Sequence, residues 1–255
     1  MSVLLAEMTR DRVKEVAPEA VAILPTASIE QHGPHLPVVT DTLLCETVVS
    51  RAASMAAPGS SDRRQMVVVP TLMFGDSVHH RPFPGVLTLS SEVYNAAVTS
   101  IVESLQLSGF RRIAIINGHG GNEAGNDLVA RNVTHYAEEL TIIAQSYWDI
   151  ARAALVADSG LPSEQIPGHA GRFETGLVLA VRPDLVDQSA LKRVKRGGTF
   201  DDGRFPKSFG ARVAGAWQHG GGWTDEPSEA TPEEGKRMLE TITGEVAELL
   251  RQLAA

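Results

Sequence analysis

The chain has 255 residues, 43% of them hydrophobic, and its formal net charge is −8 at pH 7. This length suits one α/β domain with a substantial core, so we expect a single domain over residues 1–255. The absence of a Lys/Arg-rich block and of any long apolar run excludes a nucleic-acid-binding or membrane-spanning protein as the leading interpretation.

Short runs rich in Val and Ile alternate along the chain with helical patterns. The apolar runs show little polar alternation, which is typical of parallel strands covered on both faces. In chain order the patterns predict a strand at residues 20–25, a helix at 42–57, a strand at 66–71, a helix at 91–108, a strand at 112–117, a helix at 122–139, a strand at 140–145, a helix at 173–182 and a final helix. The alternation predicts an α/β layered sandwich.

The final helix is predicted to begin after Thr231, because Thr231-Pro232-Glu233-Glu234 forms a capping box with proline at the first helical position. Before it, residues 196–228 are rich in glycine without a clear period. We expect loops and edge structure there, and an exposed loop at residues 58–64.

Three side chains that commonly bind metals follow the first predicted strand: Glu30, His32 and Asp41. Open α/β sheets place their ligand loops at the carboxyl ends of the strands, where this segment falls. In an extended segment Glu30 and His32, two residues apart, point the same way. Asp41 precedes a predicted helix, where its carboxylate can cap the helix or bridge a pair of metals. The pattern indicates a zinc or manganese site, with a polar loop as the alternative.

His119 lies in a glycine-rich turn, NGHGGN at residues 117–122, that follows the third predicted strand. Its glycines let the backbone turn sharply and approach a ligand closely. No Lys-Ser/Thr pair follows, which argues against a P-loop, and the chain has no Gly-x-Ser-x-Gly for a serine hydrolase. Tight packing is the alternative role of this turn, but His119 falls at the same sheet edge as Glu30 and His32.

A third cluster contains His169 and Glu174, five residues apart. That spacing is not one helical face, but the two side chains converge if His169 lies in a loop and Glu174 in the first turn of the next helix. The alternative is that Glu174 simply interacts with the helix dipole, as a glutamate in a first turn does in any protein.

Three segments carry a family resemblance: SIEQHGPHLPVVTDT at residues 28–42, NGHGGN at 117–122 and HAGRFET at 169–175. In this order and at these intervals they resemble the creatininase (creatinine amidohydrolase) family. The resemblance implies a three-layer α/β/α sandwich with a mostly parallel sheet. It also implies a divalent-metal cofactor, two ions of zinc, manganese or iron per chain, and a homo-oligomer such as the creatininase hexamer.

The resemblance also assigns roles to individual residues. It implies Asp41 as a ligand that bridges the two metals and His169 as the group that transfers a proton. The remaining metal ligands it implies are Glu30, His32, His119 and Glu174. We count Glu174 among the catalytic residues as well, next to His169.

The chain departs from creatininase itself in the middle motif. Creatininase has Tyr-Glu where this chain has Gly120 and Gly121, and a family tryptophan is Gln165 here, while Trp148 keeps an aromatic of that pocket. These changes argue against creatinine as the substrate and leave open whether one or two metals bind. The Gly-Gly form is shared by relatives that include formamide deformylases, a mycofactocin-maturation peptidase and hydrolases of cyclic sugar-like ketones.

The predicted function is hydrolysis of a C–N bond, in a small and cyclic amide, by metal-activated water. Substrate contacts are predicted for His80, Gly120, Gly121 and Trp148. The alternatives are C–C cleavage of a cyclic ketone, a peptidase-like maturation enzyme and a non-catalytic metal-binding scaffold. Cys45, the single cysteine, excludes an internal disulfide, and with no signal-peptide pattern visible we expect a cytoplasmic protein.

Overall fold

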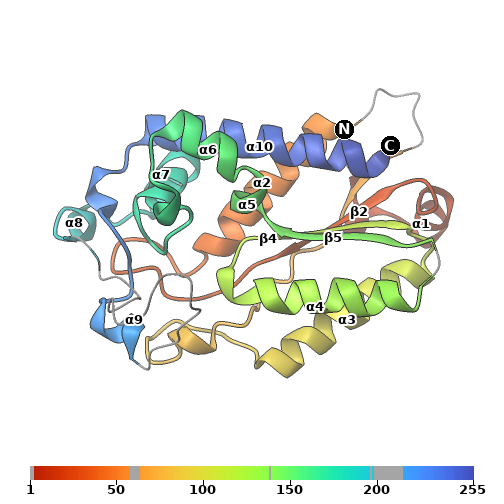
Figure 1. Ribbon diagram of the computed structural model, residues 1–255, viewed down its shortest axis with the longest axis horizontal. Coiled ribbons are helices and arrows are strands. Elements are labelled where there is room, and N and C mark those ends of the chain that lie inside the picture. The colour runs from red at the N-terminus through yellow and green to blue at the C-terminus, as the bar shows by residue number, and fades with distance from the viewer. Residues whose placement is uncertain (1–2, 58–63, 138, 196, 198–214) are drawn as a thin grey trace.

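The computed structural model describes residues 3–57, 64–137, 139–195, 197 and 215–255. Its centre is a five-stranded sheet in the order β1-β3-β2-β4-β5, in which all neighbouring strands are parallel (Figure 1). The strands are β1 (Val3–Leu4), β2 (Val21–Thr26), β3 (Met66–Val68), β4 (Arg112–Asn117) and β5 (Thr141–Ser146). The mostly parallel sheet expected from the sequence is therefore confirmed.

Helices cover both faces of the sheet, as the three-layer prediction requires (Figure 1). On one face lie α2 (Thr40–Ala56), α5 (Tyr147–Ile150), α6 (Arg152–Ser159), α7 (Arg172–Val181) and α10 (Pro232–Ala254). On the other lie α1 (Arg10–Val16), α3 (Ser91–Leu107) and α4 (Glu123–His135). Two short helices, α8 (Gln188–Leu191) and α9 (Ala216–His219), lie outside these layers at the end of the molecule that holds α7.

Alternation along β2 explains why the core has two halves. Ile23 is buried against the α2, α7 and α10 layer, whereas its neighbour Leu24 is buried against the α1, α3 and α4 layer. Every residue of β2 is buried, because successive side chains point to opposite faces and both faces are covered. A strand with this environment needs apolar residues at every position, and this is the pattern that identified it in the sequence.

Most predicted elements are present, with shifted ends. Thr231 caps the final helix as predicted, because its hydroxyl accepts a hydrogen bond from the Glu234 N–H at 3.2 Å, but the Glu234 carboxylate pairs with Arg172 rather than completing the capping box. The strand predicted at residues 66–71 ends at Val68, and the helix predicted to reach residue 139 ends at His135. The sequence patterns missed β1, α1, α5, α6 and the short helices α8 and α9.

Parts of two predicted loops lie outside the described residues: residues 58–63, and residues 196 and 198–214 of the glycine-rich segment. The described part of that segment forms α9 and a 3-10 turn, Pro227–Glu229, and contains no strand.

The pairing of β2 with β4 positions the candidate site. Thr26, the last residue of β2, lies in register with Asn117, the last residue of β4. The segments that continue from these strands therefore leave the sheet side by side, at its carboxyl edge. The first of them holds Glu30 and His32, and the second holds His119.

Candidate metal centre

Buried polar contacts tie the two strand ends together below the site. The Thr26 hydroxyl donates to Asn117 Oδ1 at 3.1 Å, and Asn117 Nδ2 donates to the main-chain oxygen of His119 at 2.7 Å. Gly118 packs against α2, where an added Cβ would lie only 2.6 Å from Cys45 Cβ. The turn that carries His119 is thus held in place by contacts that only a glycine at position 118 allows.

Asp41 lies in the first turn of α2 and places one oxygen against each of two histidines. Its Oδ1 is 3.0 Å from Nε2 of His32, and its Oδ2 is 3.1 Å from Nδ1 of His119. Asp41 is the second residue of α2 and does not occupy the N-cap position, which is Val39. This is the arrangement that a bridging carboxylate needs.

Two groups of ligand atoms share this aspartate. Glu30, Asp41 and His119 form one group, and His32, Asp41 and Glu174 form the other; within each group the ligand atoms lie within 4.8 Å of one another. All five residues are buried. Glu174 comes from the first turn of α7, and its Oε2 accepts a hydrogen bond from the N–H of Ala170. The five side chains assigned to metals from the sequence therefore do converge, and their roles stay predictions.

Hydrogen bonds to main-chain oxygens fix the ring protons of both candidate histidine ligands. His32 Nδ1 donates to the main-chain oxygen of Glu30 at 3.1 Å, and His119 Nε2 donates to that of Asp76 at 3.0 Å. Because a main-chain oxygen can only accept, the opposite ring nitrogens are unprotonated in the neutral rings. Those nitrogens face Asp41. This is the second layer of support that metal-binding histidines usually have.

Burial and mutual charge shift the pKa values of these groups strongly. Burial raises the pKa of Glu30 to about 7 and that of Glu174 to about 8. Burial alone would lower the pKa of His32, but Asp41 and Glu174 outweigh it and raise the pKa to about 10. The pKa of His119 rises to about 9 in the same way, beside Glu30 and Asp41. Burial alone would raise the pKa of Asp41, but His32 and His119 hold it well below its usual range.

The cluster fits a divalent metal. Three of its buried atoms, Glu30 Oε1, His32 Nε2 and Asp41 Oδ2, have no hydrogen-bond partner within the part of the chain that the structure describes. Buried polar atoms of this kind cost free energy unless they are paired, and buried carboxylates cost most. A divalent cation satisfies carboxylate oxygens and imidazole nitrogens at once, and this mixture of donors suits zinc, manganese or iron.

His169 and His80 approach the centre from two loops. His169 Nδ1 lies 3.6 Å from Oε1 of Glu30, and His80 Nε2 lies 3.3 Å from the same oxygen. Their rings stack, with centroids 4.4 Å apart and planes at 22°. Burial, and then the charge of His32, hold the pKa of His169 well below its ordinary value, so its ring is neutral near pH 7. Both histidines therefore face the candidate metal positions without being part of the two groups that share Asp41.

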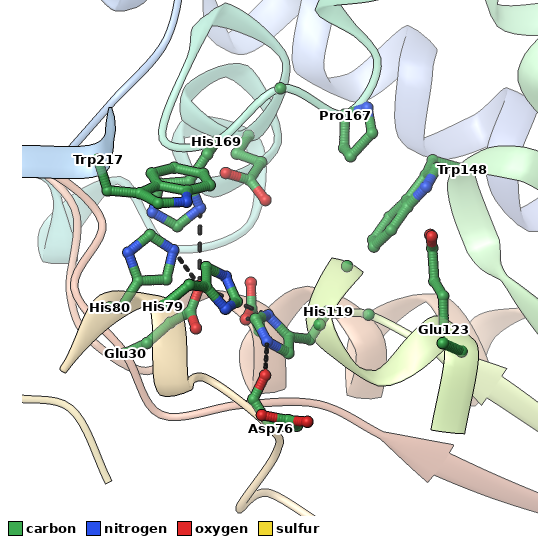
Figure 2. Close-up of a pocket in the computed structure, with 17 residues that line it drawn as sticks. Glu30, Asp76, His79, His80, His119, Glu123, Trp148, Pro167, His169 and Trp217 are labelled. Carbon is green, nitrogen blue, oxygen red and sulfur yellow. Dashed lines mark hydrogen bonds and ion pairs between the residues drawn. The ribbon is translucent and has the colours of Figure 1, made fainter. Parts of the chain in front are cut away.

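A cavity of about 660 Å³ opens over these side chains. Figure 2 shows Trp148 and Glu123 on one side of it, and Trp217, His80 and His169 on the other, with His119 between them. All four residues predicted to contact substrate line this cavity: His80, Gly120, Gly121 and Trp148. Gly120 faces open space, because a Cβ added there would meet no atom within 4 Å.

Four further polar or aromatic residues of the cavity wall had no role assigned from the sequence: Asp76, His79, Glu123 and Trp217. Glu123 directly follows the NGHGGN turn, and that position was an available signal. Trp217 lies in α9, inside the glycine-rich segment, where a lone tryptophan is equally well explained by a pocket wall or by core packing. Asp76 comes from the loop that leads into the 3-10 turn Val78–His80, and His79 lies within that turn.

Gly121 explains how this loop reaches the cavity. A Cβ added at Gly121 would lie 2.1 Å from the Asp76 main-chain oxygen and 3.1 Å from His79 Cε1. The loop therefore occupies the space that any side chain at position 121 would need. The two adjacent histidines of the loop enter the site together because this space is open to it.

Comparisons with known proteins agree with this geometry. A family model described as creatinine amidohydrolase matches residues 6–250. Creatinine amidohydrolase of Pseudomonas putida is 29% identical, over 98% of this chain and 97% of that protein. The mycofactocin precursor peptide peptidase of Mycolicibacterium smegmatis is 26% identical, over 91% of this chain and 85% of its own length. A solved structure of a mutant creatininase of Zn-Zn type superposes with a TM-score of 0.76 at 28% identity, covering 99% of this chain and 98% of the other.

Proposed function

This chain belongs to the creatininase family, and we propose that it hydrolyses a C–N bond at a centre of two divalent metals. The observation that carries the proposal is the placement of Asp41, with one oxygen toward His32 and the other toward His119. Glu30 and His119 complete one position with Asp41, and His32 and Glu174 complete the other. The Zn-Zn creatininase that it resembles supports zinc as the metal.

Bound divalent metals supply Lewis acidity, which makes water an effective nucleophile near pH 7 and polarises a carbonyl group. The protein's contribution is to orient the ligands before metal arrives. Main-chain oxygens already hold the rings of His32 and His119 with the opposite ring nitrogens toward Asp41. The two metal positions are thus built mostly from groups that need not reorganise.

His169 is placed to move the proton that hydrolysis requires. Its Nδ1, neutral and directed at the centre, accepts a proton from the attacking water. The same atom then returns that proton to the leaving nitrogen as the C–N bond breaks, so the ring ends the cycle as it began. Gly120 and Gly121 offer main-chain N–H groups to the substrate beside this path.

The cavity supports a substrate larger than the smallest cyclic amides. A volume of about 660 Å³ lies within the range of sites that hold drug-sized ligands. Because Gly120 leaves open space where creatininase has a tyrosine, a cyclic amide with a sizeable substituent is the first candidate. The same volume favours a short peptide as the second candidate, and a peptidase is among the similar proteins.

Metal analysis tests the centre directly. We expect two equivalents of divalent metal per chain after purification without chelator, and at most one in His119→Ala. A matched control, His135→Ala, removes an exposed histidine from the far end of α4 and should retain both metals. A metal-free wild-type protein that also fails to bind added zinc contradicts the proposal.

A substrate panel tests the reaction. Zinc-loaded protein is incubated with substituted cyclic amides, short peptides and cyclic ketones, and the products are identified by mass. Release of an amine with a new carboxylate supports C–N hydrolysis. Cleavage of ketones alone replaces it with C–C hydrolysis on the same ligands.

Assembly and location extend the proposal. We propose a homo-oligomer in the cytoplasm, with a small molecule as the partner at the site. No helix in the described part of the chain has the length and apolar character needed to cross a bilayer.

A further inference from the structure

Gln31 stands between two candidate ligands, Glu30 and His32, and its side chain is buried. Its amide has a single possible orientation. Oε1 accepts a hydrogen bond from the Gly33 N–H at 2.9 Å, and Nε2 donates to the main-chain oxygen of Gly222 at 2.9 Å. Rotating the amide by 180° would place its NH₂ group against the Gly33 N–H and its oxygen against the main-chain oxygen of Gly222. Both hydrogen bonds would then be lost.

The second amide hydrogen of Gln31 determines the proton position on His80. Gln31 Nε2 lies 3.1 Å from Nδ1 of His80. Since the amide nitrogen only donates, His80 Nδ1 accepts, and the ring proton of a neutral His80 lies on Nε2. His80 Nε2 faces the centre and lies 3.3 Å from Oε1 of Glu30, outside hydrogen-bond geometry. Both atoms are buried, and neither has a hydrogen-bond partner among the described residues, so the N–H of His80 is available to a substrate.

The main chain of the same residue determines the proton position on His169. His169 Nε2 lies 2.9 Å from both the main-chain oxygen and the side-chain Nε2 of Gln31. The oxygen can only accept, and the amide hydrogens are directed at Gly222 and His80. His169 therefore carries its proton on Nε2, which leaves Nδ1 unprotonated and facing Glu30 at 3.6 Å.

We propose that Gln31 is a positioning residue that fixes the ring protons of His80 and His169, and so gives the two stacked histidines opposite roles. His80 presents an N–H to the centre and acts as a hydrogen-bond donor toward a substrate oxygen. His169 presents a free Nδ1 and acts as the proton acceptor. Moving the ring proton of His169 from Nε2 to Nδ1 would turn its free nitrogen toward Gln31 and away from the centre.

One consequence concerns metal binding by the loop. Glu30, His79 and His80 also bring three ligand atoms within 4.8 Å of one another, as a metal site would require. The proton on His80 Nε2 occupies the lone pair that such a site would use. We therefore assign His80 to hydrogen bonding, and we expect a His80→Asn variant to keep its full metal content.

The proton positions are a property of the protein alone, whereas their importance for turnover rests on the proposed function. They can be measured without substrate, on zinc-loaded protein with ¹⁵N-labelled histidine, because zinc is diamagnetic. Protonated and unprotonated ring nitrogens have well-separated ¹⁵N chemical shifts, and His80→Asn and His169→Asn assign the two rings. Wild-type protein should show an Nε2-protonated form for both. An Nδ1-protonated ring at either position, or a zinc-bound Nε2 of His80, overturns the proposal.

Gln31→Met then tests whether the amide is the cause, since methionine keeps the volume and removes both hydrogen-bonding groups. We expect His80 to lose its single form and exchange between its two protonation forms, while metal content stays unchanged. The matched control Gln145→Met makes the same change on an exposed residue of β5 and should leave both rings as in wild type. If Gln31→Met leaves the His80 resonances unchanged, the amide does not position this ring.

Kinetics provide the last step once a substrate is known. Gln31→Met should lower kcat by about tenfold or more and leave KM unchanged. The proton-accepting and proton-donating ring nitrogens are then no longer fixed, while the residues of the cavity wall stay in place. An equal change in kcat for Gln145→Met, or a change in KM alone for Gln31→Met, contradicts a positioning role. Failure of the substrate panel leaves the ring-proton measurement intact, so the two proposals fail separately.

Discussion

The two ends of the cavity are built in different ways. At the metal end, Glu30, Asp41 and His119 are buried, and each is held by partners within 3.5 Å. At the far wall, Trp148 and Glu123 come from α5 and α4, and Glu123 is exposed to the cavity. The metal end has one arrangement fixed by chemistry, whereas the far wall only has to match a substrate. For this reason the residues of the metal end indicate a class of reaction, whereas those of the far wall do not identify one substrate.

Removing the carboxylate that we propose to bridge the two metals should abolish metal binding. Asp41→Ala takes one oxygen from each of the two ligand groups, so we expect both metals to be lost and activity to fall below detection. Elemental analysis and circular dichroism of the folded variant check this outcome. The control Asp127→Ala removes an exposed acid of α4 and should change neither property. Retention of two metals by Asp41→Ala would mean that the carboxylate does not bridge.

Replacing His169, the proposed proton acceptor, should keep the metals bound and slow the reaction. We expect His169→Ala to lower kcat by about 10²–10⁴, the usual contribution of general acid–base catalysis, with metal content unchanged. Steady-state rates on the first substrate found by the panel measure the effect. An unchanged kcat removes His169 from the mechanism, while lost metal would make it a ligand instead.

Lowering the pH should weaken metal binding at the metal end and leave the far wall unchanged. In the metal-free protein the pKa values of His32 and His119 are raised to about 10 and about 9, so both rings are protonated at pH 7. Metal binding must displace these protons, so affinity rises with pH up to that range and falls about tenfold per proton for each unit below it. Glu174 and Glu30, with pKa values raised to about 8 and about 7, are also partly protonated at pH 7, so zinc titration calorimetry in buffers of different ionisation enthalpy should show release of more than two protons. Affinity independent of pH between 6 and 8 contradicts this account.

The far wall should respond most weakly. Glu123 accepts a hydrogen bond from Ser146 at 2.8 Å and lines the cavity on the side of Trp148. Replacing the carboxylate by an amide keeps an acceptor for Ser146 and weakens at most one hydrogen bond to a substrate, worth about 0.5–1.5 kcal/mol, so Glu123→Gln should change KM by roughly 2- to 10-fold, with kcat and metal content unchanged. The control is Asp127→Asn, one helical turn further along α4. A large loss of kcat or metal would place Glu123 in the metal end and erase the distinction between the two regions.

Sequence patterns identified the fold where both faces of an element are covered. β2 and β4 were predicted to within one residue, because buried parallel strands require apolar residues throughout. β1 has only two residues, and α5 has four. Elements this short do not complete a hydrophobic period, so tertiary contacts rather than local sequence determine them.

The same limit applies within the site. The spacing of Glu30 and His32 predicted that they share one side, and the structure agrees. By the same alternation Gln31 should point away from them. The amide of Gln31 instead reaches His80 and His169. Residues 27–33 form only isolated bridges, and the Gly33 N–H donates a hydrogen bond to the amide oxygen that holds the side chain on this side. The alternation rule holds for regular strands and fails where the backbone bends.

Gly121 has a consequence for how this protein can diverge. The main-chain oxygen of Asp76 lies where a Cβ at position 121 would be. The loop before His79 can therefore keep its present position only if residue 121 is a glycine. A single Gly121→Glu substitution cannot convert this chain to the creatininase form, because the loop must first withdraw. The two segments are expected to covary among homologues, and an engineer who wishes to exchange substrate ranges must transplant them as one unit.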